Sequence, residues 1–214
     1  MTTGKFIVLE GIDGSGTTTQ TQLLANYLYE RDKRNIILLT REPTELSREG
    51  QEVRRRLSGR LAPGEEVNHD PEYWTQLFIA DRRWHLDQFV VPTVMRGGQV
   101  ISDRHKLSTL AYQSAQGMNM DDLIRRHERF YQPQLTLVID VPVAIALERI
   151  GKVRQGSPDY FERKDFQEKV RANYLLAVEK LPGTEPIVVL DGTKSIAEVA
   201  KAIQAEVNKL YGYQ

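Results

Sequence analysis

A glycine-rich segment near the start of the chain has the spacing of a phosphate-binding loop. Gly11 and Gly16 are separated by four residues, follow a short apolar run and precede a segment of helical periodicity. Glycines let consecutive backbone N–H groups turn toward phosphate oxygens, and the N-terminus of the next helix adds positive potential. The hydroxyl of Thr18 stands where such loops ligate Mg²⁺. The predicted phosphate contacts are Gly11, Gly14, Ser15, Gly16, Thr17, Thr18 and Thr19.

One position of this loop departs from the usual pattern. Thr17 replaces the lysine that ordinarily places a positive charge on the β- and γ-phosphates. Electrostatic stabilisation is most of what a protein contributes to phosphoryl transfer. Two alternatives therefore stay open, a phosphotransferase that finds this charge elsewhere and a noncatalytic nucleotide-binding protein. A glycine turn that merely precedes a helix is the simplest alternative.

Charged residues follow two further apolar runs. Arg41 comes after the second run, and Asp103 and Arg104 come after the third. Because the carboxyl ends of parallel strands meet at one edge of a sheet, these side chains are expected near the phosphate loop. Asp103 suits Mg²⁺, or the N-terminus of a helix, and the two arginines suit phosphates. A surface ion pair is the alternative for Arg41, and His105 is given no catalytic role.

An aromatic and an arginine lie on one helical face. Trp74, Phe78 and Arg82 are spaced four residues apart. Such a pair can stack on a base and donate to its carbonyl, although aromatics at this spacing more often pack in a core. A polar helix at residues 108–113 offers hydroxyl and amide groups.

Five short apolar runs without polar alternation predict the scaffold of these residues. Runs of this kind form parallel strands covered on both faces, and helical segments separate them. The fold class is therefore α/β, a five-stranded parallel sheet flanked by helices in a three-layer sandwich. The predicted strands are Phe6–Leu9, Ile36–Thr40, Gln99–Ser102, Leu135–Asp140 and Pro186–Leu190.

Helical periodicity and breaking residues predict the connections. The polar segment Gly151–Pro158 contains two glycines and a proline and predicts a mobile loop, here taken as a lid over about residues 150–160. The predicted helices are a crossover after the phosphate loop and residues 71–95 (interrupted near Pro92), 121–130, 142–150, 163–181 and 195–210.

Composition limits the function classes. The 214 residues predict a single domain, and 29 Lys+Arg balance 29 Asp+Glu, so no bulk positive field attracts nucleic acid or an anionic membrane. The absence of cysteine excludes disulfides, thiolate catalysis and Cys-based zinc sites. No apolar run approaches the roughly 20 residues of a membrane span. We expect a cytoplasmic protein without a membrane or nucleic-acid partner.

Taken together, these motifs resemble those of the thymidylate kinase family, a group of nucleoside monophosphate kinases with a P-loop fold and a closing lid. The stretch from Asp103-Arg-His to Ala111-Tyr-Gln113 is the most specific part, and the resemblance covers almost the whole chain. The other matching segments are Glu10–Gly16 with Thr19-Gln20, Thr40–Pro43, Leu77–Arg82, Pro133–Asp140 and Val170–Leu175.

The resemblance implies transfer of the γ-phosphoryl group of Mg·ATP to dTMP, which gives dTDP for dTTP biosynthesis, and a homodimer. The alternatives are a kinase for another pyrimidine (deoxy)nucleotide or a deoxynucleoside, and a noncatalytic relative. By position, Asp13 would hold the 3′-OH, Arg41 and Arg104 the acceptor phosphate, and Phe78 the thymine face. Arg82 and Thr109 would meet the base edge, Tyr112 would exclude a ribose 2′-OH, Gln113 would lie close by, and Thr18 and Asp103 would hold the metal.

The phosphate loop lacks the arginine that some family members carry at this point, since residues 12–15 contain none. The resemblance is therefore to members that supply cations from the lid. We expect Arg149, Lys152 and Arg154 to act in catalysis together with Arg104, and Glu162 to help organise the metal.

Overall fold

The computed structural model describes residues 4–62, 64–66, 68, 70–153, 163–181, 183 and 185–213. Its five strands form one parallel sheet in the order β2-β3-β1-β4-β5. The sheet predicted from the sequence is confirmed, with every strand end within one residue of its expected place. The strands are β1 (Phe6–Glu10), β2 (Ile37–Arg41), β3 (Gln99–Asp103), β4 (Leu135–Asp140) and β5 (Ile187–Asp191).

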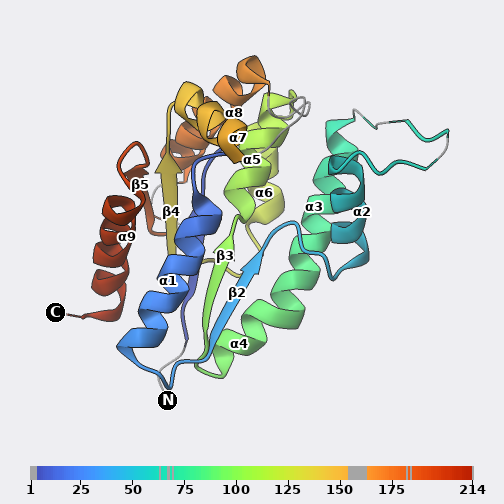
Figure 1. Ribbon diagram of the computed structural model, residues 1–214. Helices are drawn as coiled ribbons and strands as arrows, with labels where there is room; N and C mark the ends of the chain where they lie inside the picture. The colour runs from blue at the N-terminus through green and yellow to red at the C-terminus, as the bar shows by residue number, and fades with distance from the viewer. Residues whose placement is uncertain are drawn as a thin grey trace.

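Helices surround this sheet, and α1 and α9 cross its front in Figure 1. A π-helical turn, η1, joins two of the helices. The elements are α1 (Thr17–Arg31), α2 (Arg48–Leu57), α3 (Pro71–His85), η1 (Leu86–Val90), α4 (Val91–Met95), α5 (Lys106–Ala115), α6 (Met120–His127), α7 (Val143–Val153), α8 (Lys164–Lys180) and α9 (Ile196–Tyr211).

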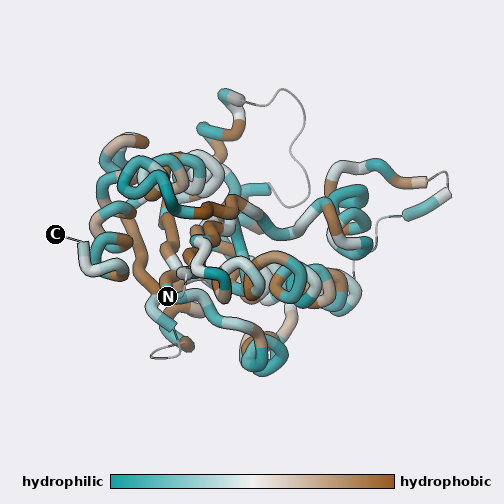
Figure 2. Tube along the Cα trace, turned by 90° about the horizontal axis from the view of Figure 1, so that it is seen from below, coloured by the Kyte–Doolittle hydropathy of each residue, from teal (hydrophilic) through white to brown (hydrophobic). Residues whose placement is uncertain are grey.

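Alternate side chains of β1 enter two different cores. Phe6 and Val8 pack with apolar residues of η1 and α4, whereas Ile7 and Leu9 belong to the larger cluster that includes α1 and α9. All four side chains are fully buried. Burial of both faces explains why β1 is a continuous apolar run, and Figure 2 shows apolar strands inside a more polar shell of helices.

The structure corrects two expectations about helices and confirms an interruption in one of them. Helix α2 was not predicted, because Val53 and Leu57 are its only apolar side chains and only Gly50 and Val53 of its ten residues are buried. The interruption predicted near Pro92 is a π-helical turn, since α3 ends at His85, η1 follows and α4 begins at Val91. The predicted loop over Gly151–Pro158 is wrong for residues 151–153, which extend α7, and its remainder lies outside the described residues.

Candidate active site

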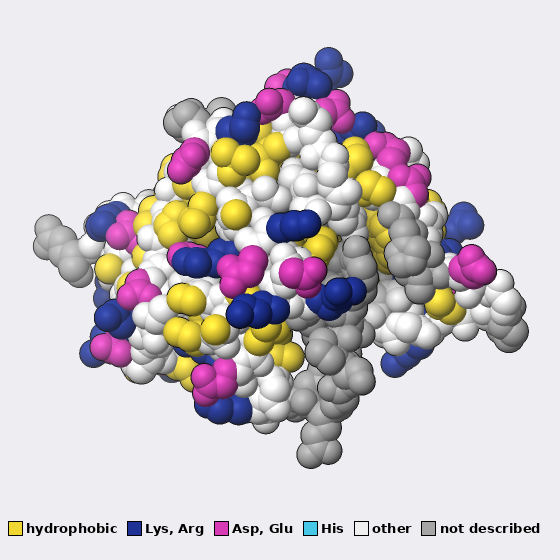
Figure 3. All heavy atoms as spheres, turned by 90° about the horizontal axis from the view of Figure 1, so that it is seen from above, with side chains coloured by type: hydrophobic (Ala, Val, Ile, Leu, Met, Phe, Trp, Pro, Cys, Tyr) yellow, Lys and Arg dark blue, Asp and Glu magenta, His cyan; other side chains and the backbone are white. Residues whose placement is uncertain are grey.

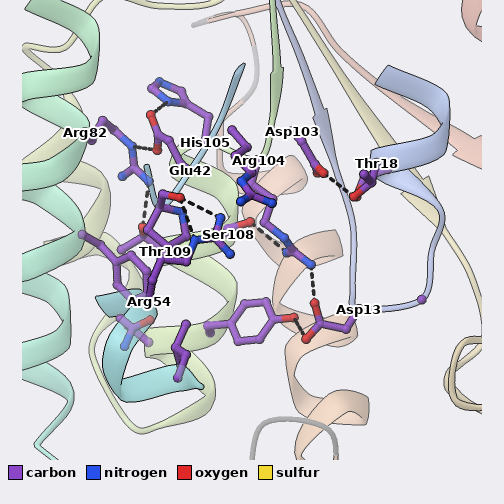
Figure 4. Close-up of a pocket in the computed structure, with 18 of the residues that line it drawn as sticks. Asp13, Thr18, Glu42, Arg54, Arg82, Asp103, Arg104, His105, Ser108 and Thr109 are labelled. Atoms are coloured by element: carbon purple, nitrogen blue, oxygen red, sulfur yellow. Dashed lines mark hydrogen bonds and ion pairs between the residues drawn. The ribbon is translucent and has the colours of Figure 1, made fainter. Parts of the chain in front are cut away.

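A cavity of about 450 Å³ opens at the carboxyl ends of β1, β2 and β3. The phosphate loop, the segment after β2, α2, α3 and α5 contribute its walls, as the close-up in Figure 4 shows. Cationic and anionic side chains are interspersed on the face of the molecule seen from above (Figure 3), in keeping with the zero net charge. The predicted site residues that line the cavity are Asp13, Gly14, Gly16, Thr17, Thr18, Thr19, Arg41, Phe78, Arg82, Asp103, Arg104, Thr109, Tyr112 and Gln113.

The phosphate loop is held so closely that two of its glycines cannot carry a side chain. A Cβ on Gly14 would lie 2.4 Å from the carbonyl oxygen of Ala146 in α7, and the residue has φ +80°. A Cβ on Gly11 would lie 2.6 Å from the hydroxyl oxygen of Ser15. The loop therefore rests against α7, the helix that precedes the predicted lid.

Two oxygen donors from different elements meet beside this loop. Thr18, in the first turn of α1, donates a hydrogen bond of 2.5 Å to Oδ2 of Asp103 at the end of β3. The other oxygen of Asp103, Oδ1, is buried without a hydrogen-bond partner among the described residues. A hydroxyl and a carboxylate with an unused buried oxygen fit Mg²⁺, which takes few protein ligands. The described residues hold no cluster of three His, Asp or Glu side chains that could bind a metal alone.

Arg104 lies between the phosphate loop and α8. Its Nη2 is 2.6 Å from Oδ1 of Asp13, and its Nη1 donates to the carbonyl of Gly11 at 2.9 Å and to the hydroxyl of Tyr174 at 3.1 Å. Its φ of 75° is in the left-handed region, which is uncommon for a residue with a side chain. Tyr112 donates to the other oxygen of Asp13 at 3.0 Å. Asp13, Tyr112 and Arg104 are thus one hydrogen-bonded unit.

A buried glutamate binds the partners of Arg104. Glu10 accepts hydrogen bonds from Ser108 Oγ at 2.6 Å, from Tyr174 at 3.1 Å and from the backbone N–H of His105 at 2.8 Å. Burial raises the pKa of Glu10 to about 7, although these hydrogen bonds and the charge of Arg104 act against the rise. Neither Glu10 nor Tyr174 was predicted in the site, because their contacts join residues 66 to 164 positions apart.

Arg82 lies at the back of the cavity, and it is only 1% exposed. Its Nε donates to Glu42 at 2.7 Å, and its Nη2 donates to Thr109 at 3.0 Å. Burial alone would raise the pKa of Glu42, but the charge of Arg82 together with the interactions of His105 and His85 holds this pKa well below its usual value.

Both expectations for the aromatic face of α3 are met in part. Trp74 is buried in the interior, whereas the half-buried Phe78 lines the cavity. Their rings stack with centroids 6.3 Å apart and an interplanar angle of 30°. The stack leaves Phe78 at the cavity wall, beside Arg82 on the next turn of the helix.

Arg54 lines the cavity but was missed by the sequence analysis. It projects from α2 and donates through Nε and Nη2 to the carbonyl of Pro43, at 3.0 and 2.7 Å. Burial lowers its pKa, and the positive charges of Arg41 and Arg104 lower it further. An anion between these three arginines would relieve their repulsion. Recognition of α2 as a helix would have been needed to place Arg54.

The other predicted cations lie away from the cavity or at its rim. Arg41 lines it and forms an exposed ion pair with Glu45. Arg149 donates to the carbonyl of Gly192 at 2.9 Å, and the exposed Lys152 pairs with Glu148 at 2.6 Å. Neither Arg149 nor Lys152 is among the described lining residues. Arg154 and Glu162 lie outside the described residues.

This geometry agrees with the comparison to known proteins. A family model described as thymidylate kinase matches residues 9–203. The chain belongs to the thymidylate kinase family. The match spans the phosphate loop, every strand after the start of β1 and the residues around the cavity, so the family resemblance found in the sequence is confirmed.

Individual relatives are similar over nearly their full length. A probable thymidylate kinase of Pyrococcus horikoshii is 39% identical over 194 residues, which cover 90% of this chain and 92% of the relative. The thymidylate kinase of Nitrosospira multiformis is 34% identical over 212 residues, which cover 97% and 98%. The family therefore favours a phosphotransferase over a noncatalytic nucleotide-binding protein.

The helices give no indication of a membrane span. Within the described part of the chain, none is both long enough and apolar enough to cross a bilayer.

Proposed function

We propose that this cavity binds dTMP beside ATP and transfers the γ-phosphoryl group of ATP to it, which yields dTDP and ADP. The observation that carries the proposal is the meeting of three arginines, Arg41, Arg54 and Arg104, beside a phosphate loop and a stacked Phe78. The family supports the same reaction. A kinase for another pyrimidine nucleotide would share the loop and differ at the base wall.

The acceptor would lie with its base toward α3 and its phosphate toward Arg104. Phe78 offers a flat apolar face for the pyrimidine, and Arg82 and Thr109 offer donors at its edge, with Gln113 nearby. Asp13 offers a carboxylate to the 3′-OH of the sugar. Tyr112, which already donates to Asp13, would crowd the sugar where a ribose 2′-OH would lie.

In the chemical step, an oxygen of the dTMP phosphate attacks the γ-phosphorus of ATP, and the bond from that phosphorus to the β–γ bridging oxygen breaks. The released electron pair leaves with ADP. Arg104 would hold the attacking phosphate, and the backbone N–H groups of residues 11–16 with Ser15, Thr17 and Thr19 would hold the donor. Fixed positive groups at these points stabilise charge that spreads over the transferring group.

Thr18 and Asp103 would hold Mg²⁺ at the phosphate loop. The bound ion neutralises phosphate charge. When the ion binds, Thr18 would give up its hydrogen bond to Oδ2 of Asp103. Oδ1 of Asp103, which has no partner among the described residues, would be available to the hydrated ion.

Because the phosphate loop lacks its usual lysine, other cations would have to stabilise more of the charge on the transferring phosphoryl group. We infer that Arg149, Lys152 and Arg154 approach the γ-phosphoryl group when the predicted lid closes, and that Glu162 supports the metal. The weak ion pair of Lys152 with Glu148, four residues apart on an exposed surface, costs little to exchange for a phosphate.

The wider context of the enzyme follows from the same proposal. Its partners would be ATP and dTMP rather than a membrane or nucleic acid, and it would act in the cytoplasm as a single-domain homodimer.

A coupled ADP-release assay with ATP and a panel of acceptors tests the function. dTMP should give the highest kcat/KM among dTMP, dUMP, UMP, CMP, AMP and thymidine. A faster reaction with UMP or thymidine would contradict the pocket assignment. Binding of ATP without acceptor-dependent ADP release would instead select the noncatalytic alternative.

A further inference from the structure

A buried histidine in contact with Arg82 has no role in the proposed reaction. His127, at the end of α6, is 2% exposed. Its Nε2 lies 2.6 Å from Nη1 of Arg82, and its Nδ1 lies 2.6 Å from the carbonyl oxygen of Leu123. The ring therefore connects Arg82 to the backbone of a helix that does not itself line the cavity among the described residues.

These two contacts define which ring nitrogen carries the proton. A carbonyl oxygen only accepts, so Nδ1 of His127 has to be the donor to Leu123. A guanidinium only donates, so Nε2 has to present its lone pair to Arg82. Burial, followed by the positive charge of Arg82, lowers the pKa of His127 to about 3, which agrees with a neutral ring.

The guanidinium of Arg82 is consequently held on three sides by acceptors from three elements. Glu42 follows β2, Thr109 lies on α5 and His127 lies on α6, at sequence separations of 40, 27 and 45 residues. A guanidinium has five N–H donors in one plane. The described partners engage three of them, and the others are available to a ligand in the cavity that Arg82 lines.

We propose that His127 is a positioning residue for base selection, which together with Glu42 holds Arg82 so that its remaining donors meet a carbonyl oxygen at C4 of the pyrimidine. This inference rests on the proposed function, in which Arg82 contacts the base. Thymine and uracil carry an oxygen at C4, whereas cytosine carries an amino group that only donates. A guanidinium held by fixed acceptors cannot turn away, so a cytosine base would meet it donor against donor.

The test compares two substitutions at this position. His127→Leu removes the acceptor with a similar apolar volume, and His127→Gln keeps a side-chain oxygen. Loss of a hydrogen bond to a charged group should raise the KM for dTMP about tenfold in His127→Leu and lower the ratio of kcat/KM for dTMP over dCMP by a similar factor. The KM for ATP should not change. His127→Gln should recover most of both losses.

A control separates positioning from simple packing of α6. Leu123→Val removes buried volume from the same helix without touching the acceptors of Arg82. It should lower the melting temperature and leave the dTMP to dCMP ratio unchanged. An equal drop of this ratio in Leu123→Val, or no drop in His127→Leu, would overturn the proposal. If His127→Leu does not fold, His127→Asn supplies the comparison, since its shorter side chain withdraws the acceptor from Arg82.

A double-mutant cycle distinguishes the role of His127 from the proposed contact of Arg82 with the base. In an Arg82→Lys background, His127→Leu should have little further effect on the KM for dTMP, because His127 acts through Arg82. If Arg82→Lys leaves the KM for dTMP and the dCMP ratio unchanged, the base assignment itself fails, and both proposals fail together. If Arg82→Lys impairs dTMP use and the two substitutions add independently, only the role of His127 is overturned.

Discussion

The cations assigned to the acceptor and to the donor are held in different ways. At the proposed acceptor site, Arg82 and Arg104 are bound by mostly buried partners. Apart from Ser108, which accepts from Arg104 at 3.1 Å, these partners are 27 to 93 residues away. At the proposed donor site, Lys152 forms an exposed pair with Glu148 four residues away, which contributes about 0–1 kcal/mol. The difference indicates that Arg82 and Arg104 are held in place before a ligand binds, whereas Lys152 can exchange its partner at little cost.

The largest test of this contrast is Arg104→Ala. The substitution removes a charged contact that ligand binding desolvates and also releases Asp13 and Tyr174. We expect a loss of about 2–4 kcal/mol of transition-state stabilisation, roughly 30- to 1000-fold in kcat/KM. Steady-state kinetics with dTMP measure it, and near-wild-type kcat/KM would remove Arg104 from the site.

The proposed donor site should respond differently. Neutralising Arg149, Lys152 or Arg154 to glutamine should lower kcat about tenfold in at least one case, while the KM for dTMP stays nearly constant, because these contacts form mainly in the closed state. Single-turnover rates separate the chemical step from product release. A parallel rise in the KM for dTMP would show that these cations also contribute to dTMP binding and would contradict the prediction.

The next prediction tests whether Arg54 belongs to the acceptor site. Arg54→Leu should raise the KM for dTMP about tenfold with a small change in kcat, since it removes one partly buried cation facing the acceptor phosphate. Arg55→Leu is the matched control, because Arg55 belongs to the same helix but pairs with Glu52 and Glu65. Equal effects of the two substitutions would indicate a structural role for α2 alone.

The buried acceptor site also predicts a pH dependence of stability. Burial lowers the pKa of His127 to about 3 and that of His105 to about 4, from 6.5. Between these values and 6.5 the unfolded chain binds protons that the folded chain excludes, so the free energy of unfolding falls as the pH falls. Glu10, with its pKa raised from 4.5 to about 7, acts in the opposite direction between pH 4.5 and 7.

His127→Gln should therefore weaken the pH dependence. It removes up to one of these protons, and the slope of unfolding free energy against pH between about 4 and 6.5 should decrease by as much as about 1.4 kcal/mol per pH unit. Urea denaturation at several pH values measures the slope. An unchanged slope would mean that His127 is not held neutral.

The smallest effect is expected from restoring the loop lysine. If cations from the lid already supply the charge, Thr17→Lys should change kcat only a few-fold. The substitution has to fit a side chain that is now 5% exposed, so a melting curve is needed as the control for folding. A gain of a hundredfold or more would show that the donor site lacks a charge that nothing replaces.

Local sequence patterns were sufficient for the sheet and for the phosphate loop. Strands buried on both faces have to be continuous apolar runs, and glycine is the only residue that tolerates the approach of Ala146 to Gly14, so both features are visible in a short window of sequence. Arg104 and Asp103 could be placed at the site for a related reason, because parallel strands deliver their carboxyl ends to one edge.

The support of these residues depends on contacts that no window contains. Arg54 was missed because α2 is a charged helix with little buried surface, and its helical structure depends on Ser47 as N-cap and on packing against α3. No local sequence pattern marks Glu10, Tyr174 or His127 as a contact of the site. Only the folded chain brings them against Arg104 and Arg82 or their partners. Hydrogen bonds are stronger in the buried, low-dielectric interior, so these acceptors fix the orientation of the two guanidinium groups.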